Sequence, residues 1–246
     1  MNCSDTPPVK SRTAKPLHLK PDHPAVAGRR SLFAGMVRDD WPHVLVDGVY
    51  NKKIGGKVKK GWLSGLPLYT VTLQERATCP PDCHHFLTCY GNRMNRARRH
   101  VVDEGFVVRL GSEIGERLAA SPDGIMVRVH VLGDFFSVAY VEAWAGWLRE
   151  HPKLRVWGYT AWKPDSEIGK AVAALPAEFG WNRAAIRFSS GGMAARCAVP
   201  TSVASARGRT PDGVVCPAQT DSEEKTTCST CALCWTSECN VVFIDH

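Results

Sequence analysis

The chain has 246 residues, 44% of them hydrophobic and 22% charged, which is ordinary for a soluble globular protein of one large domain or two small ones. No apolar run approaches the roughly 20 residues that a helix needs to span a bilayer, so we expect no membrane partner. Since no apolar signal core is visible either, the expected location is cytoplasmic.

The net charge of +7 lies entirely in residues 1–60, which hold 12 Lys and Arg against 5 Asp. Up to about residue 30 this segment is rich in Pro, Lys and Ser without periodicity, which predicts partial disorder. Basic segments often follow the phosphates of DNA or RNA, so a nucleic acid is the expected partner of this arm. A solvated tail would have the same composition. The sequence leaves the oligomeric state open.

Strands and helices are predicted to alternate along the chain. Runs of β-branched and aromatic residues predict strands at 68–73, 125–131, 154–160, 184–189 and, at a sheet edge, 241–244. Amphipathic spacing predicts helices at 92–103, 111–120, 138–150 (with Ser137 as N-cap) and 164–175. This alternation favours an α/β fold, either a partial (β/α) barrel or a compact, mainly parallel sheet.

Three parts are expected along the chain. The basic, partly disordered N-terminal arm covers residues 1–60, and an α/β core of the catalytic type covers residues 61–200. A cysteine-rich, metal-binding segment over residues 201–246 packs on that core. Ten cysteines in a chain without an export signal favour metal ligation over a disulfide framework.

The first cysteine cluster has the spacing Cys-x3-Cys-x5-Cys and follows the first predicted strand, with Cys79, Cys83 and Cys89 as its members. Three thiolates could hold a [4Fe–4S] cluster and leave one iron open for a substrate or cofactor. They could also bind Zn2+, with His84 or His85 as the fourth ligand.

Three further residues are candidates for binding a cofactor. Arg93 and Arg96 lie on one face of the predicted helix after the cluster, where arginine could bind a phosphate or carboxylate. A solvated helix is the alternative interpretation. Gly133 breaks the strand that ends near residue 131 and directly precedes Asp134.

The second cluster is Cys228, Cys231 and Cys234, spaced Cys-x2-Cys-x2-Cys, with Cys216 available as a fourth thiolate. Either a [4Fe–4S] cluster or Zn2+ could occupy four such ligands. The tight spacing leans towards iron–sulfur, because small zinc modules usually contain two separated Cys-x2-Cys pairs. The spacing does not say whether the metal is structural or catalytic. The remaining cysteines are unassigned: Cys3, Cys197 and Cys239.

Polar residues follow the predicted strands and would meet at one edge of a parallel sheet, as active-site residues often do. Arg128 and His130 alternate along one strand, so both should point to the same face. Asp134 could act as a base or nucleophile and His130 as a proton shuttle. Three other residues are candidates: Tyr159 as a ring that stacks on a base, Arg187 as an anion-binding group and Ser189 as a hydroxyl. The alternative interpretation is that His130 is a histidine of the core and Asp134 a residue of a turn.

Several of these segments resemble the phage gene-product-88-like proteins, over about residues 68–236. The matching pieces are the cysteine loop ending at Tyr90, residues 128–137, Gly-Tyr-Thr at 158–160 and the final Cys-x2-Cys-x2-Cys-Trp. More distantly, the layout is similar to radical S-adenosylmethionine enzymes, whose loop has Cys-x3-Cys-x2-Cys, and this likeness implies S-adenosylmethionine as a cofactor. It is also similar to zinc-containing deazaguanine transglycosylases. That second likeness implies Asp134 as nucleophile, residues 189–192 as a base-binding loop and zinc at the C-terminal cysteines.

The leading hypothesis is a phage-type metalloenzyme that modifies a nucleic acid or nucleotide. An iron–sulfur site at the first cluster would face His130 and Asp134. The first alternative is a zinc-dependent base transglycosylase acting on DNA or RNA. The second is a non-catalytic, zinc-stabilised nucleic-acid-binding protein.

Overall fold

The structure, a computed structural model, describes residues 17–189, 214–220, 223, 225–237 and 241–243. Residues 1–16 of the expected arm lie outside these residues, as do residues 190–192 of the expected base-binding loop. The same holds for Cys3, Cys197 and Cys239. No helix in the described part of the chain is both long and apolar enough to cross a membrane.

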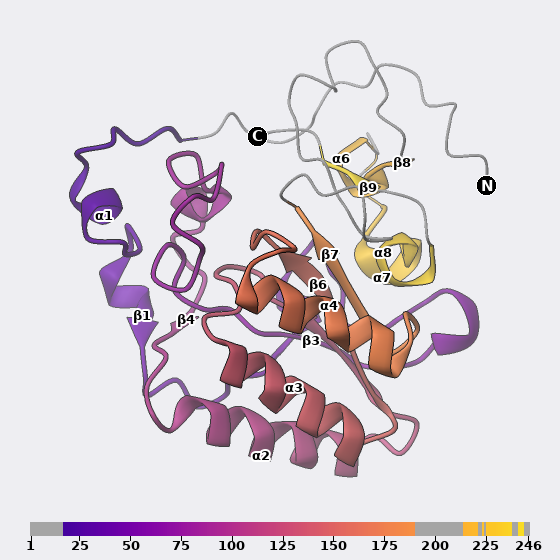
Figure 1. The fold of residues 1–246 in the computed structure, drawn as a ribbon. Helices are drawn as coiled ribbons and strands as arrows, with labels where there is room; N and C mark the ends of the chain where they lie inside the picture. Colours follow the sequence, from indigo (N-terminus) through magenta and orange to yellow (C-terminus); the bar gives the residue numbers. More distant parts are fainter. Residues whose placement is uncertain (1–16, 190–213, 221–222, 224, 238–240, 244–246) are drawn as a thin grey trace.

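A five-stranded sheet forms the centre of the fold (Figure 1). Its strands, in spatial order, are β2 (Val46–Asp47), β3 (Leu68–Thr70), β5 (Ile125–Val129), β6 (Leu154–Thr160) and β7 (Ala184–Phe188). All neighbours pair in parallel except the edge strand β2, which is antiparallel to β3. The expected α/β class and parallel pairing are confirmed, whereas the described strands form no closed barrel.

Three helices cover one face of this sheet: α2 (Phe106–Ala119), α3 (Val138–Glu150) and α4 (Glu167–Phe179) (Figure 1). Their positions follow from local signals. The Ser137 hydroxyl accepts a hydrogen bond from the Tyr140 amide and begins α3, as predicted. Ser166 caps α4 in the same way. Burying a large side chain such as Trp144 contributes about 1.5–3 kcal/mol to this helix-side core.

The opposite face is covered by irregular segments and not by long helices. Two 3-10 turns, η2 (Gly48–Tyr50) and η3 (Gly61–Leu63), belong to a loop that packs here. The short helices α7 (Cys228–Cys231) and α8 (Leu233–Thr236) complete the cover, and Trp235 contacts Trp157 of β6 with ring centroids 4.8 Å apart. We call this side the open face. The described residues 228–236 of the C-terminal cysteine-rich segment therefore pack on this face.

The remaining elements are short. They are α1 (Pro24–Ala27), η1 (Ala34–Met36), β1 (Val37–Arg38), η4 (Tyr90–Arg93), β4 (Arg99–His100), β8 (Val214–Val215), α6 (Pro217–Thr220) and β9 (Val241–Val242). Strand β1 pairs with β4 and β8 pairs with β9, both in parallel. The predicted edge segment at 241–244 therefore belongs to a separate two-stranded sheet.

Two predictions differ from the structure in the first hundred residues. The helix expected at 92–103 is wrong: the chain there forms a 3-10 turn and then the extended strand β4. The boundary expected at residue 60 is not a boundary either, because Val44, Ile54 and Val58 are buried in the cores of the main sheet. From residue 17 onwards, the expected arm is largely part of the folded domain.

Candidate functional site

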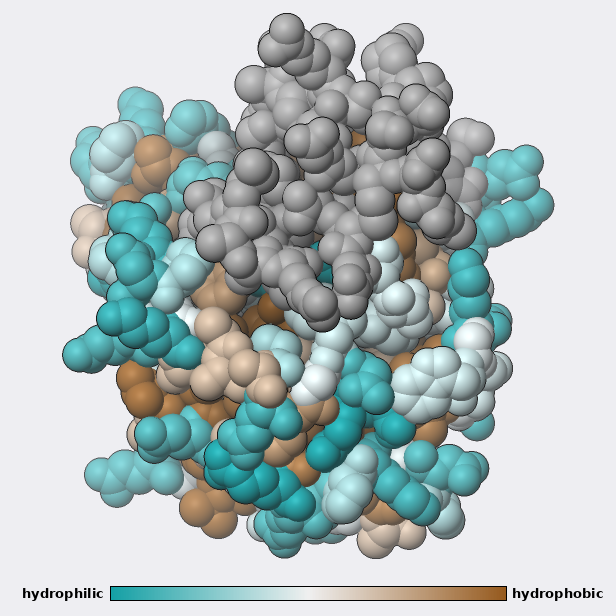
Figure 2. All heavy atoms as spheres, turned by 45° about the vertical axis from the view of Figure 1, so that its right-hand side comes forward, coloured by the Kyte–Doolittle hydropathy of each residue, from teal (hydrophilic) through white to brown (hydrophobic). Residues whose placement is uncertain are grey.

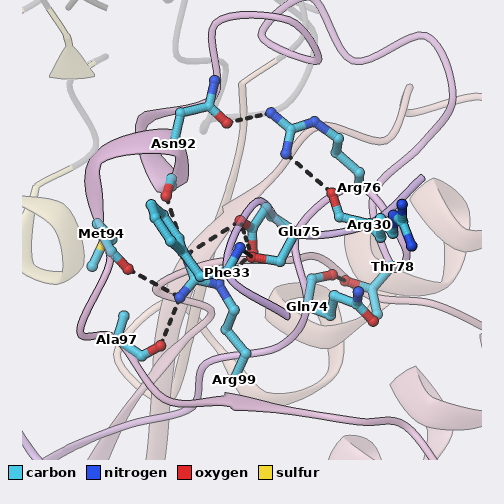
Figure 3. A network of polar contacts seen from close by, with 12 residues as sticks. Arg30, Phe33, Gln74, Glu75, Arg76, Thr78, Asn92, Met94, Ala97 and Arg99 are labelled. Atoms are coloured by element: carbon cyan, nitrogen blue, oxygen red, sulfur yellow. Dashed lines mark hydrogen bonds and ion pairs between the residues drawn. The ribbon is translucent and has the colours of Figure 1, made fainter. Parts of the chain in front are cut away.

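A buried ion pair fixes the chain on both sides of the first cysteine cluster (Figure 3). The Arg99 Nε donates to Glu75 Oε2 at 2.6 Å, and both side chains are fully buried. The other N–H groups of Arg99 bond to the second Glu75 oxygen and to the carbonyls of Gly91, Met94 and Ala97. All five donors of this arginine are therefore used. This pairing explains why Arg99 lies in a strand and not on a helix face.

Arg76 ties the cysteine loop to the N-terminal segment. Its guanidinium donates to the Arg30 carbonyl and to the Asn92 side chain (Figure 3), and its Nε donates to the Phe86 carbonyl. Asn92 in turn donates to the Leu17 and Leu87 carbonyls. The cysteine loop is thus held from inside by buried polar groups, each with a partner.

The three thiols of this loop form one group, which we call the first thiol group: Cys79, Cys83 and Cys89. Burial, followed by the nearby Asp134, Cys89 and Cys83, raises the pKa of the Cys79 thiol well above its ordinary value. Burial raises the pKa of Cys89 to about 11. His84 is exposed and His85 half-buried beside them. Lys163 and Asp82 form an ion pair that links the loop to the segment after β6.

Asp134 lies at the carboxyl end of the sheet and is buried. Its Oδ1 accepts hydrogen bonds from the Phe135 amide (2.7 Å) and the Thr160 hydroxyl (2.8 Å), and its Oδ2 accepts one from the Ala161 amide (2.7 Å). Its own amide donates to the Thr78 hydroxyl. Burial raises the pKa of Asp134 to about 7, against the opposing effect of these hydrogen bonds. The carboxyl can therefore gain or lose a proton near neutral pH.

His130 faces the helix side of the sheet. Its Nε2 lies 3.0 Å from the Tyr140 hydroxyl, and its ring packs on Phe135, both in the helix-side core. Arg128 lies on the open face instead, so the expectation that the two side chains share a face is wrong. The regular strand ends at Val129, before the alternation reaches His130. Burial, followed by the charge of Arg128, lowers the pKa of His130 to about 3.

The C-terminal thiols form the second thiol group: Cys216, Cys228, Cys231 and Cys234. Burial, and then the neighbouring Cys234 and Cys216, raise the pKa of Cys228 well above its ordinary value. Burial, and then Cys234, raise the pKa of Cys216 to about 12. The four thiols thus lie close enough for their charges to interact. None of the seven described cysteines forms a disulfide.

Two predicted catalytic residues hold this segment on the open face. The Tyr159 hydroxyl donates to Cys234 Sγ at 2.7 Å. The buried Arg187 donates to the carbonyls of Cys234 (3.0 Å) and Ser237 (2.7 Å). Both residues therefore contact the second thiol group and not Asp134, so the structure separates them from the residues with which they were predicted to act.

Arg128 lies near both the second thiol group and Asp134, a position that sequence reasoning missed. Its guanidinium stacks on Trp157 and Tyr159, at 4.7 and 4.5 Å from the ring centroids. Its positive charge partly opposes the increase that burial causes in the pKa of both Cys228 and Asp134. The signal that could have indicated this position was a charged residue within the buried strand β5, where Arg128 pairs with Trp157.

The other predicted site residues lie apart or have structural surroundings. Ser189 follows β7, and its hydroxyl donates to the Thr160 carbonyl, close to Asp134. Arg93 and Arg96 are exposed. Gly133 has a φ of +77°, and a Cβ there would lie 2.5 Å from the Thr78 hydroxyl, so the chain needs glycine for its conformation.

The described thiols gather without forming a complete ligand set. Within the residues that the structure describes, no three His, Cys, Asp or Glu side chains are arranged to hold a metal ion. The chemistry of the donors fits such a group, because four thiols in one place are the ligand set of structural zinc and of iron–sulfur clusters. The metal ligands therefore stay a prediction.

Comparison with protein-family models gives a match. The model of a family described as Gene product 88 matches residues 44–237, most of the chain. This match confirms the resemblance found in the sequence. No curated protein and no solved structure matches the chain, so the likenesses to radical S-adenosylmethionine enzymes and to transglycosylases have no support there.

Proposed function

We propose that this protein, which belongs to the gene product 88 family, is a metal-dependent enzyme that modifies a nucleic acid or a nucleotide. In this proposal the first thiol group holds an iron–sulfur cluster at the carboxyl end of the sheet. The second thiol group holds a further cluster or a Zn2+ ion. The proposed setting is the host cytoplasm, where a reducing environment keeps thiols unlinked.

The observation that carries the proposal is the gathering of seven thiols into two groups. All seven are half-buried, and none is linked to another. Burial alone keeps a thiol protonated, and a protonated thiol is a weak metal ligand. A bound cation would reverse this effect, because it stabilises the thiolate form directly. Four thiols near one another thus suit a metal better than they suit a hydrophobic core.

The catalytic part of the proposal depends on Asp134. The first thiol group lies near enough to this carboxyl that its charge raises the pKa of Cys79. A metal at this group would supply Lewis-acid or electron-transfer chemistry when bound. Asp134 would then hold or accept a proton near neutral pH, positioned by Thr160 and Ala161. His130 is less suited to proton transfer, because its pKa lies far below neutrality.

Metal analysis of thiol variants tests the proposal. We expect Cys83→Ser to reduce the metal bound by the first thiol group while leaving the second loaded, and Cys231→Ser to do the reverse. Cys3→Ser is the matched control, because Cys3 belongs to neither cysteine cluster. Equal metal content in all three variants would contradict the assignment of ligands.

A second candidate, the non-catalytic zinc-stabilised nucleic-acid-binding protein, is favoured by one set of observations. Asp134, Tyr159 and Arg187 all bond to groups of the same fold, as structural residues do. Asp134→Asn separates the candidates. An enzyme loses turnover and keeps its affinity for nucleic acid, whereas a binding protein has no turnover to lose. The transglycosylase alternative needs Asp134 as a nucleophile, and its three hydrogen bonds argue against that role.

A further inference from the structure

A strongly basic surface lies beside the second thiol group, on the loop that covers the open face. The stretch from residue 48 to residue 74 contains no Asp or Glu. It contains five exposed lysines, which with their loop we call the basic hairpin: Lys52, Lys53, Lys57, Lys59 and Lys60. Within the described part of the chain, none of these lysines forms an ion pair.

The backbone of the basic hairpin is fixed by hydrogen bonds. Val58 donates to the Leu66 carbonyl at 2.9 Å, and Gly65 donates to the Val58 carbonyl at 2.8 Å. The loop is also bonded to α7, because Lys59 donates to the Ser229 carbonyl and Ser229 donates to the Ile54 carbonyl. In Figure 1 this purple loop lies beside α7 and α8. Its lysines therefore project from a preformed scaffold.

Two aromatic rings accompany the lysines at the surface. Tyr50 is 83% exposed and Trp62 is 65% exposed, although rings of this size are usually buried. The Arg155 guanidinium lies 5.0 Å from the centre of the Trp62 ring and adds a further positive charge. An exposed ring next to a cation is the arrangement on which an unpaired base can stack while its phosphates meet the lysines.

We infer that the basic hairpin binds single-stranded nucleic acid, with its lysines on the phosphates and with Tyr50 and Trp62 against the bases. The inference rests on the nucleic-acid substrate of the proposed function and adds its docking surface. An anionic membrane is the other partner that lysines and aromatic rings attract. The structure favours nucleic acid, because Ile54, Leu63 and Leu66 of this loop are buried in the core, which leaves Val49 as its exposed aliphatic side chain and too little apolar surface for insertion into lipid.

The hydropathy of the surface agrees with this choice. Figure 2 turns the right-hand side of Figure 1 forward, and outside the grey atoms hydrophilic and hydrophobic residues are interspersed on this face. A membrane-binding surface would need a continuous apolar area.

The test is the binding of labelled oligothymidine and oligouridine of about 12 nucleotides by fluorescence anisotropy, over a series of salt concentrations. We expect Lys52→Glu with Lys60→Glu to weaken binding about ten-fold and to lower the salt slope by about 1.4, since each phosphate contact contributes about 0.7 on single strands. Lys20→Glu with Lys170→Glu changes the net charge equally at exposed positions elsewhere, and should leave the affinity near that of the original protein.

A second pair of variants tests the stacking. Trp62→Ala should weaken binding about five-fold or more, and Trp62→Phe should restore most of it, because a phenyl ring can still stack. Equal affinity in the hairpin and control charge variants would overturn the inference. So would binding to vesicles of phosphatidylserine and phosphatidylcholine in place of oligonucleotides, or unchanged binding by Trp62→Ala.

Metal content measured on the same samples keeps the two proposals apart. Oligonucleotide binding by metal-free protein would support the inference about the basic hairpin and contradict the proposal of a metal-dependent enzyme. A metal-loaded protein that binds no oligonucleotide would overturn the hairpin inference and still support the proposed metal sites.

Discussion

Asp134 and His130 are both buried, and burial moves their pKa values in opposite directions. The pKa of Asp134 rises to about 7, so between pH 4 and 7 the folded protein keeps a proton that the unfolded chain releases. Stability from this group is present at low pH and falls as the pH rises. The pKa of His130 falls to about 3, so the unfolded chain binds the extra proton below about pH 6.5. Stability from His130 therefore rises with pH, and the two effects oppose each other.

Replacing Asp134 by Asn should remove the contribution of Asp134 to the pH dependence of stability and leave that of His130 unopposed. Between pH 4.5 and 6, we expect the free energy of unfolding of Asp134→Asn to rise more steeply with pH than that of the original protein, by about 1.4 kcal/mol per pH unit. Urea denaturation at several pH values measures this difference. Parallel curves for the two proteins would show that Asp134 titrates in the folded state as it does in the unfolded chain.

The Glu75–Arg99 pair should be the most sensitive ion pair among those described here. Glu75→Gln leaves the guanidinium of Arg99 buried without its counter-charge, which typically costs about 3–5 kcal/mol. The exposed pair of Arg149 and Glu178 is the matched control, and Glu178→Gln should cost less than about 1 kcal/mol. Chemical denaturation compares the two variants. Similar losses in both would mean that the buried network does not hold the cysteine loop.

At the scale of elements, the C-terminal segment depends on its contacts. Helices α7 and α8 have four residues each, too few to be stable alone. Arg187→Ala removes the bonds to the Cys234 and Ser237 carbonyls, so we expect faster amide exchange over residues 228–237 and less bound metal. Arg183→Ala is the control, because Arg183 bonds to carbonyls on the helix side, at Leu148 and His151. Equal exchange in both variants would contradict the anchoring role of Arg187.

The sequence predicted those elements whose signals are local. The helix at 138–150 and the strand at 154–160 match the structure at both ends, because the Ser137 cap and the run of apolar residues act within a few positions. The helix at 92–103 failed because a distant residue, Glu75, holds Arg99 in an extended segment. No spacing within the segment could have shown that pairing.

Part of the candidate site was predictable from the expected order of strands and helices. Parallel strands bring their carboxyl ends together, so the proximity of Asp134, Thr160 and Ser189 followed from the predicted topology. The bonds of Tyr159 and Arg187 to the second thiol group were not predictable, because they depend on where the C-terminal segment docks. Family membership adds no activity to these residues, so their roles depend on experiment.

At the scale of the whole molecule, the sheet has two unlike faces. Regular helices cover one face, and on the other short segments bring both the second thiol group and the basic hairpin beside the sheet. Helix α7 is joined to the basic hairpin by backbone hydrogen bonds, so loss of metal should also loosen the hairpin. A chelator should therefore lower the affinity for oligonucleotides, whereas salt-dependent binding that survives metal removal would separate the two sites.

Metal and sulfide analysis of protein purified without oxygen, together with its visible absorption spectrum, tests the central claim most directly. The account predicts a brown protein with iron and matching inorganic sulfide, about four of each per cluster. A colourless protein with zinc alone would contradict the iron–sulfur assignment and favour the zinc-stabilised binding protein. A colourless protein without metal would contradict both.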